Sequence, residues 1–287
     1  MQPRWRCIRC AKDLPPGDSG CACGWSLQKR KDYFASTSSA FVPDGFSEER
    51  RDHLRDLDER HFWFDAREKL LTRIFLRECR TTFPRALDLG CGTGRFLATL
   101  EKFGGELVVG VDGHDGLACV AAERATSATV VAADVENVPL ASEQFDLITL
   151  LDVLEHVDPL SLLKEARRLA APGAHLLISV PAHDWLWSST DEAAGHRCRY
   201  DRAMLRAELE KTGWSPGGST HYQALLLPLV LATRRVRSDR AIGVERRPPV
   251  WLNRFLGACN SFEVAALSRF SLPFGSSLVA WAWKDMP

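Results

Sequence analysis

The amino-acid sequence predicts an α/β protein built on a doubly wound sheet, and three observations support this. Short apolar runs alternate with helical patterns between residues 85 and 212, and a glycine-rich turn joins the first run to a helix. An acidic residue stands at or just beyond the end of four of the runs. Strands that alternate with helices are typical of a parallel sheet with helices on both faces.

The first predicted strand, Ala86–Leu89, leads into the turn and helix start G-C-G-T-G-R-F. Gly90, Gly92 and Gly94 allow a tight backbone turn and a close approach to a ligand. A dinucleotide-binding fingerprint has a glycine at the sixth position, and counted from Gly90 that position is Arg95. The turn therefore predicts a nucleotide-like cofactor, and its spacing disfavours a dinucleotide.

The same patterns place the other elements in order along the chain. One or two amphipathic helices are expected within 46–80, where apolar residues 70, 71, 74 and 75 form a stripe at helical spacing. Further strands are expected at 107–111, 129–133, 145–151, 175–180 and 277–283, and helices at 114–125, 159–169 and 201–212. A Pro-Gly turn at 172–173 should lead into the fifth strand, and Gly213 should end the last of these helices.

Acidic residues stand at or just beyond the ends of the first four predicted strands: Asp88, Asp112, Asp134 and Asp152. One such residue can be explained as the cap of the following helix. In a doubly wound sheet, however, ligands bind outside the carboxyl ends of the strands. Together the four acids predict a ligand site at that edge.

These motifs resemble those of the class I S-adenosylmethionine-dependent methyltransferases over roughly residues 85–182. The turn A-L-D-L-G-C-G-T-G resembles the first family motif, and A-A-D-V-E-N-V-P-L and F-D-L-I-T-L-L-D-V-L-E-H-V resemble later ones. The resemblance implies a Rossmann-like, seven-stranded, mostly parallel sheet with helices on both faces, and S-adenosyl-L-methionine as the cofactor. It assigns the ribose to Asp112, the adenine to Asp134 and Val135, and the methionine end to 152–156.

The segment E-R-H-F-W-F-D-A-R adds aromatic residues and a cation upstream. Spacing alone is equally compatible with an aromatic core stripe and a solvated arginine. A similar H-F-W-F-x-x-R helix lies over the cofactor in the Methyltransf_11/23-like group, which implies that Arg67 binds the cofactor carboxylate. The full expected cofactor set is Trp63, Arg67, Asp88, Gly90, Cys91, Gly92, Gly94, Asp112, Gly113, Asp134, Val135, Leu151, Asp152 and His156.

The acceptor is expected at the segment that follows the fifth strand, which resembles the family stretch W-S-x-x-D-x-x-x-G-H-x-R-R-Y. A hydroxyl acceptor must lose its proton, and histidine is the commonest base. His196 is the first candidate, followed by His156 and His183, and a structural role is the alternative for each. The expected substrate-binding residues are Trp187, Asp191, Arg197, Arg199 and Tyr200. Cys198 replaces an arginine of the family stretch, and Asp191 and Tyr200 could instead only hold the loop.

The amino terminus contains four cysteines within 17 residues, Cys7, Cys10, Cys21 and Cys23. Four thiolates can form a tetrahedral zinc site that orders a short segment with little core of its own. The spacing therefore predicts a structural zinc ion in a zinc-ribbon-like segment, with a tail of idle thiols as the alternative. Basic residues 4, 6, 9 and 29–31 leave open that this segment recognises nucleic acid or a protein.

Three regions are expected along the chain: the zinc-ribbon-like four-cysteine segment at 1–31, a helical N-terminal lid at 32–84, and a class I methyltransferase domain at 85–287. The last region contains an expected helical insertion near 221–262. Within it, 224–236 is apolar and is followed by arginines. This segment is expected to be a lid over the acceptor, or an interfacial helix that brings peripheral membrane contact and meets a lipid-linked substrate.

Composition narrows the function further. The 37 basic and 37 acidic side chains cancel, so no overall nucleic-acid footprint is indicated. Neither a signal peptide nor an apolar run of about 18 residues is present, and we expect a cytoplasmic protein. The expected activity is methyl transfer to a small molecule or a saccharide, chiefly at oxygen. The alternatives are methylation of RNA or protein with the ribbon as recognition module, and a non-catalytic zinc-dependent interaction protein. The oligomeric state is not predicted.

Overall fold

The structure is a computed structural model that describes residues 1–36, 56, 58, 61–78, 83–103, 105–228, 231, 249–267 and 271–286. Much of the helical region predicted at 46–80, and most of the apolar segment at 224–236, lie outside the described residues. So does the central part of the insertion predicted at 221–262. No helix in the described part of the chain is long and apolar enough to span a bilayer.

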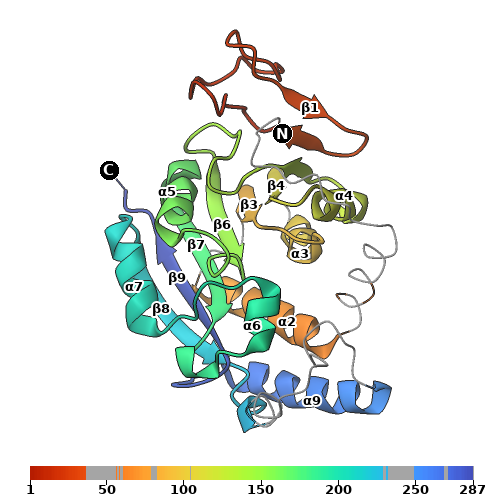
Figure 1. Cartoon of the computed structure of the whole chain (residues 1–287), viewed down its shortest axis with the longest axis vertical. Coiled ribbons are helices and arrows are strands. Elements are labelled where there is room, and N and C mark those ends of the chain that lie inside the picture. The colour runs from red at the N-terminus through yellow and green to blue at the C-terminus, as the bar shows by residue number, and fades with distance from the viewer. Residues whose placement is uncertain are drawn as a thin grey trace.

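Within the described ranges, nine strands form one sheet in the order β1-β2-β5-β4-β3-β6-β7-β9-β8 (Figure 1). The centre of the sheet is parallel and consists of β5 (Thr129–Ala132), β4 (Leu107–Asp112), β3 (Arg85–Leu89), β6 (Phe145–Leu151) and β7 (Ala170–Pro181). Strand β9 (Ser277–Trp283) runs antiparallel between β7 and β8 (Ser215–Tyr222). The predicted doubly wound, mostly parallel sheet is confirmed, and β1 and β2 extend it beyond the seven strands that were predicted.

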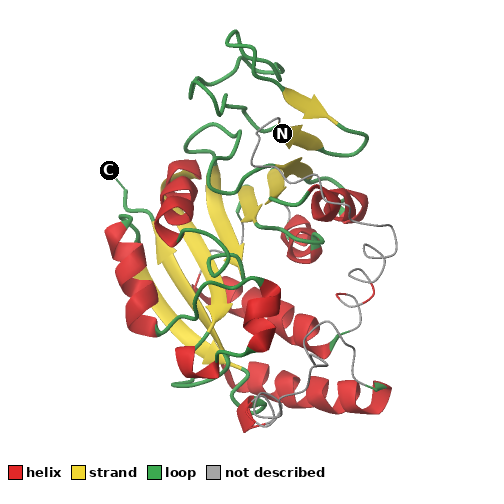
Figure 2. Cartoon of the chain, in the orientation of Figure 1, coloured by secondary structure: helices red, strands yellow, loops and turns green. Residues whose placement is uncertain are grey.

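Helices cover both faces of the sheet (Figure 2). Helices α2 (Phe62–Glu78), α3 (Arg95–Lys102) and α4 (Asp115–Arg124) share one apolar cluster, which Ala86, Val108 and Leu147 of the strands also join. Helices α5 (Pro159–Leu169) and α7 (Arg202–Lys211) share the other cluster with Leu87 and Ile148. Neighbouring strand residues thus enter opposite cores, as the two-residue period of a strand requires.

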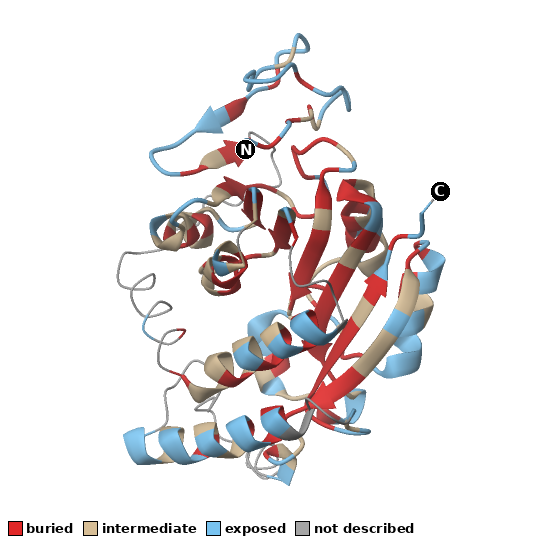
Figure 3. Ribbon diagram, turned by 180° about the vertical axis from the view of Figure 1, so that it is seen from behind, coloured by how far each residue is buried: buried red, intermediate tan, exposed pale blue. Residues whose placement is uncertain are grey.

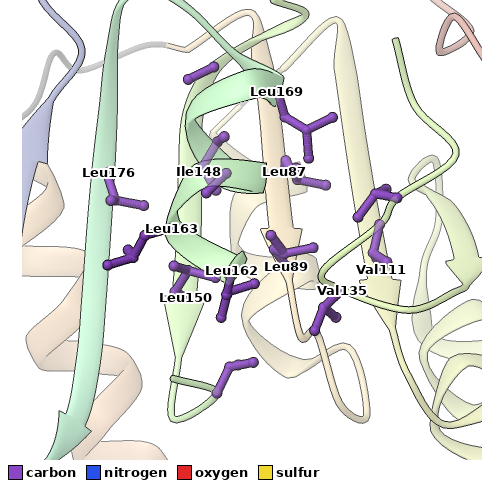
Figure 4. Packing of buried hydrophobic residues seen from close by; sticks show 14 of the residues in the cluster. Leu87, Leu89, Val111, Val135, Ile148, Leu150, Leu162, Leu163, Leu169 and Leu176 are labelled. Atoms are coloured by element: carbon purple, nitrogen blue, oxygen red, sulfur yellow. The ribbon is translucent and has the colours of Figure 1, made fainter. Parts of the chain in front are cut away.

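The packing of α5 shows how one face is held together (Figure 4). Leu162, Leu163 and Leu169 are fully buried and face Leu87 and Ile148 of the strands. Full burial of a leucine side chain stabilises a fold by about 1.5–3 kcal/mol. Pro159 begins the helix, and the Asp158 side chain accepts a hydrogen bond from the Ser161 amide at 2.9 Å. The helix thus begins with a side-chain cap and a proline, both of which favour a helix start.

The amino-terminal segment extends the sheet, a feature that the sequence did not reveal. Strands β1 (Leu27–Lys29) and β2 (Phe34–Ser36) form a hairpin, and β2 pairs in parallel with β5 at the sheet edge. Trp5 is buried in the α5 face of the core, and Gln144 exchanges two hydrogen bonds with the Arg4 backbone at 2.7 and 2.9 Å. Phe34–Ser36 is thus a strand within the region expected to be helical, 32–84.

Other differences from the sequence expectations are local. Strand β8 was not predicted because S-P-G-G-S-T-H-Y has neither an apolar run nor clear alternation. Strand β7 begins earlier than expected, and Pro172-Gly173 forms an irregularity within it rather than a separate turn. A 3-10 turn (Asp184–Leu186) and helix α6 (Ser189–Ala194) follow β7. Helix α9 (Val250–Leu267) packs beside α2, and much of its outer face is exposed (Figure 3).

Candidate functional site

A cavity of about 550 Å³ lies at the carboxyl ends of β3, β4 and β6, with α2 beside it. The sequence predicts ligand binding at this edge of the sheet. The cavity is lined by eleven of the fourteen expected cofactor residues: Arg67, Asp88, Gly90, Cys91, Gly92, Asp112, Gly113, Val135, Leu151, Asp152 and His156. Trp63, Gly94 and Asp134 do not line it. Asp134 instead accepts a hydrogen bond from the Glu136 amide at 2.9 Å, within the loop that follows β5.

Asp112 is fixed at the end of β4 by two backbone donors. Its Oδ2 accepts from the Gly92 amide and its Oδ1 from the His114 amide, both at 2.8 Å. Burial raises the pKa of this carboxyl group, and the two amide hydrogen bonds oppose that rise. Each oxygen retains a further lone pair, so the carboxylate can also accept hydrogen bonds from a ligand in the cavity.

Asp88 is the most deeply buried acid at the cavity wall. The Thr149 hydroxyl donates to its Oδ1 at 2.6 Å. Burial raises the pKa of Asp88 to about 6, against the lowering effect of the Thr149 hydrogen bond. The environment therefore disfavours the charged form, and a cationic or hydrogen-bond-donating ligand group would offset that cost.

Two glycines of the turn differ in what surrounds them. Gly92 has φ +54°, and a Cβ added there would meet no atom within 4 Å. Gly94 has φ +77°, and a Cβ there would lie 2.8 Å from the Cα of Ala121 in α4. Gly92, which lines the cavity, thus has free space beside it, whereas Gly94 allows α3 and α4 to pack closely.

Arg67 reaches the cavity from α2 and pairs with Asp152, with 2.6 Å between Nη1 and Oδ2. Asp152 also accepts a hydrogen bond from the Ser179 hydroxyl at 2.9 Å. Its backbone φ is +57°, a value that residues other than glycine rarely adopt. The Trp63 ring lies against the Arg67 guanidinium, 5.1 Å from ring centroid to Cζ. Helix α2 thus places a cation at the end of the cavity where 152–156 begins.

Two candidate bases meet beside the cavity. His156 lines it, and the His196 ring lies 4.8 Å from the His156 ring in an edge-to-face arrangement. Burial and the neighbouring charge of His196 lower the pKa of His156. Asp191, expected to bind substrate, is buried and lies 3.0 Å from Nδ1 of His196, while Arg199 donates to the same carboxylate oxygen. Asp191 and Arg199 therefore hold the His196 loop.

The remaining acceptor candidates lie apart from the cavity. The His183 ring stacks between Trp185 and His221, at centroid distances of 5.2 and 4.9 Å. Tyr200 is fully buried in the core, and its hydroxyl donates to the Leu154 carbonyl at 3.3 Å. Trp187 is partly buried and Arg197 is exposed. Their predicted substrate contacts stay predictions.

Some residues of the cavity were not singled out from the sequence. Arg95 begins α3 and forms ion pairs with Asp65 and, at 2.7 Å, with Glu68 of α2. The Thr93 hydroxyl donates to Asp58 at 2.6 Å. Glu68, Thr93 and Arg95 all line the cavity. Their charges and spacing resemble an ordinary solvated helix surface, so no pattern in the chain indicated that this network joins α2 to the glycine-rich turn.

The four amino-terminal cysteines converge as expected. Sγ of Cys7 lies 3.5 Å from Sγ of Cys23, Cys10 and Cys21 are equally close, and the four sulfurs lie within 4.8 Å of one another. All four are free thiols. Four zinc-bound thiolates at about 2.3 Å from the metal would be separated by similar distances. The donor set therefore fits a zinc ion.

Comparison with known sequences gives a consistent picture. Residues 87–178 match the Methyltransf_11 family, a methyltransferase domain. A ubiquinone biosynthesis O-methyltransferase of Methylococcus capsulatus is 32% identical over 134 residues, which are 42% of this chain and 56% of that protein. The protein of the same description from Hahella chejuensis is 33% identical over 138 residues, 42% of this chain and 57% of that protein. The chain spans little more than half the length of these relatives.

Solved structures share the fold at low sequence identity. One is a chain from the complex between the Haloferax volcanii Trm112 methyltransferase activator and the putative methyltransferase, with a TM-score of 0.57 at 16% identity over 86% of this chain and 98% of that one. Another is a methyltransferase of Thermotoga maritima, described as a possible histamine N-methyltransferase, with a TM-score of 0.53 at 18% identity over 82% of this chain and 97% of that one.

Proposed function

The chain belongs to the class I S-adenosylmethionine-dependent methyltransferases, and we propose that it transfers a methyl group to an oxygen atom of a small molecule or a saccharide. The observation that carries the proposal is the cavity at the strand ends, which Asp88, Asp112 and Asp152 line together with Gly92 of the glycine-rich turn. This placement of acids around a glycine-rich turn suits a ligand with ribose hydroxyls and an ammonium group.

Different residues of the chain would bind different parts of the cofactor. With the cofactor bound, Asp112 would accept hydrogen bonds from the ribose hydroxyls, and Val135 would hold the adenine. Asp88 and Asp152 would hold the amino group of the methionine end, and Arg67 its carboxylate. When bound, S-adenosylmethionine supplies an electrophilic methyl group on sulfur. Positioning that group against the acceptor and excluding water are the main contributions of the protein.

The acceptor side of the cavity is the end near His156 and His196. The new bond joins the acceptor oxygen to the methyl carbon as the sulfur–methyl bond breaks, and the hydroxyl proton must leave. We assign this proton to His196, because Asp191 accepts a hydrogen bond from its Nδ1 and Nε2 then remains as the acceptor nitrogen. The relatives described as O-methyltransferases of ubiquinone biosynthesis support a small molecule as the acceptor.

A structural zinc ion at Cys7, Cys10, Cys21 and Cys23 is part of the proposal. The convergence of the four sulfurs supports it, and the apolar residues of the segment are packed on the sheet. With this packing, the segment's first role is to support the sheet edge at β5 rather than to offer a free recognition surface.

The proposal is tested by incubating the protein with S-adenosylmethionine labelled at the methyl group and with fractionated cell RNA, protein and small-molecule extract. Label in the small-molecule fraction is expected. The Asp112→Ala variant, which lacks the ribose acceptor, serves as the inactive control. Label mainly in RNA or protein would show instead that the acceptor is a macromolecule. Label in no fraction, together with no binding of S-adenosylhomocysteine, would leave a non-catalytic zinc-dependent interaction protein.

A further inference from the structure

Three metal-ligating side chains of the described chain meet next to the cofactor cavity, away from the four cysteines. Glu155, His156 and His196 each bring one ligand atom into a group whose members lie within 4.8 Å of one another. Glu155 and His156 follow β6, whereas His196 follows α6, so two separate segments form the group. His156 also lines the cavity, which places the group at the acceptor side of the site.

Glu155 supplies a second, independent observation. Its side chain is completely buried, and neither carboxylate oxygen has a hydrogen-bond partner within the described ranges. A buried carboxylate without a partner is strongly unfavourable, and buried charges are normally paired or coordinate a metal ion. The two imidazoles beside it are metal ligands when neutral. An ion bound among them would supply the missing partner.

Asp191 prepares His196 for this role. Its Oδ1 lies 3.0 Å from Nδ1 of His196 and accepts two hydrogen bonds from Arg199, at 2.9 and 2.6 Å. A carboxylate oxygen in such contacts is an acceptor, so Nδ1 carries the imidazole proton and Nε2 retains its lone pair. Histidines that bind metals commonly donate their other ring N–H to a carboxylate in this way. Asp191 therefore acts as a positioning residue.

We propose that Glu155, His156 and His196 bind a divalent transition-metal ion at the acceptor end of the cavity. Two imidazoles and one carboxylate favour zinc, iron or cobalt over magnesium or calcium. Ligands about 2.1 Å from an ion lie at most about 4.2 Å apart, so closure needs movements below an ångström. Provided that the proposed function holds, the ion would bind the acceptor oxygen and make its hydroxyl proton more acidic. His196 would then be a ligand rather than the base, and the hydroxyl proton would pass to a water molecule instead of to His196.

Metal content measures this site without reference to activity. The wild-type protein, equilibrated with excess Co²⁺ and then dialysed to remove unbound ion, is expected to hold two cobalt ions per chain, one in each ligand group. The two differ in spectrum, because only the cysteine group gives thiolate charge-transfer absorption. His156→Ala/His196→Ala and Glu155→Gln should each hold one, with the thiolate absorption retained. His183→Ala, a histidine outside the group, is the matched control and should hold two.

Affinity gives a finer test of the positioning residue. Asp191→Asn is expected to weaken binding of the second ion by about 10- to 100-fold and to leave the cysteine group unchanged. Thermal unfolding of the same samples shows whether each variant is folded, and titration of S-adenosylhomocysteine reports separately on the proposed cofactor site. A wild type that holds cobalt only in the cysteine group, two ions in the double histidine variant, or the loss of one ion in His183→Ala would each overturn the proposal.

Discussion

Replacing Gly92 and Gly94 one at a time by alanine should separate a glycine that serves the ligand from a glycine that serves packing. Both residues have positive φ, so alanine costs about 1–2 kcal/mol at either position. Alanine also restricts the unfolded chain, which returns about 0.4–1 kcal/mol. Because nothing lies within 4 Å of a Cβ added at Gly92, the net destabilisation there should be about 1 kcal/mol.

The same change at Gly94 adds a steric overlap. The new Cβ would lie 2.8 Å from the Cα of Ala121, and backbone atoms of α4 cannot turn aside as a flexible side chain can. Overpacking of this kind costs about 1–3 kcal/mol, which gives a total of about 2–4 kcal/mol. One kcal/mol shifts the melting temperature of a large domain by about 2–4 °C, so Gly94→Ala should melt roughly 4–16 °C below the wild type.

Thermal unfolding and titration with S-adenosylhomocysteine together form the assay. Gly92 lines the cavity and an added Cβ there meets no atom within 4 Å. If the methyl group takes space that the ligand needs, Gly92→Ala should melt near the wild type and bind the ligand at least about tenfold more weakly, a loss of about 1.4 kcal/mol. Gly94→Ala should melt much earlier and still bind when folded. Equal melting temperatures of the two variants, or unchanged ligand binding by Gly92→Ala, would refute this assignment.

Three further outcomes are expected. Because the folded-state pKa of Asp88 is raised to about 6, its ionisation should destabilise the protein as pH rises from about 4 to about 6, by up to about 3 kcal/mol. Asp88→Asn should remove this pH dependence in denaturant unfolding, and an unaltered profile would contradict it. Cys10→Ser/Cys21→Ser should lose zinc and lower the melting temperature, because the segment continues the sheet through β2; equal melting of both proteins would argue against that support. Arg67→Lys should weaken S-adenosylhomocysteine binding by about tenfold in calorimetry, because lysine cannot donate two parallel hydrogen bonds to a carboxylate. Unchanged affinity would mean that the ligand carboxylate binds elsewhere.

The strands at the centre of the sheet could be predicted because burial on both faces makes them continuous apolar runs. Strand β8 escaped prediction because its pairing with β9 gives it structure that its own polar and glycine-rich sequence does not specify. The hairpin β1–β2 escaped because each strand has three residues, and its place at the edge of β5 depends on distant contacts such as that of Trp5 with the core.

The candidate site also contains residues that the sequence could locate and residues that it could not. The acids at Asp88 and Asp112 could be located because the chain order of a doubly wound sheet fixes where strand ends meet. The sequence could not predict the burial of Tyr200 or the contact between Asp191 and His196, because both depend on how a polar loop folds back on β6 and β7. Glu155 stands in the motif D-V-L-E-H-V, yet only the structure shows that its carboxylate is buried without a partner.

The most direct test of the central claim is calorimetric titration of S-adenosylhomocysteine into the wild-type protein and into Asp112→Ala. The cavity at the strand ends predicts one molecule bound per wild-type chain. The variant should bind it at least about tenfold more weakly, because a charged hydrogen-bond acceptor worth about 1.5–3 kcal/mol is lost. Absence of binding to the wild type, or equal affinity of the two proteins, would contradict the assignment of this cavity to S-adenosylmethionine.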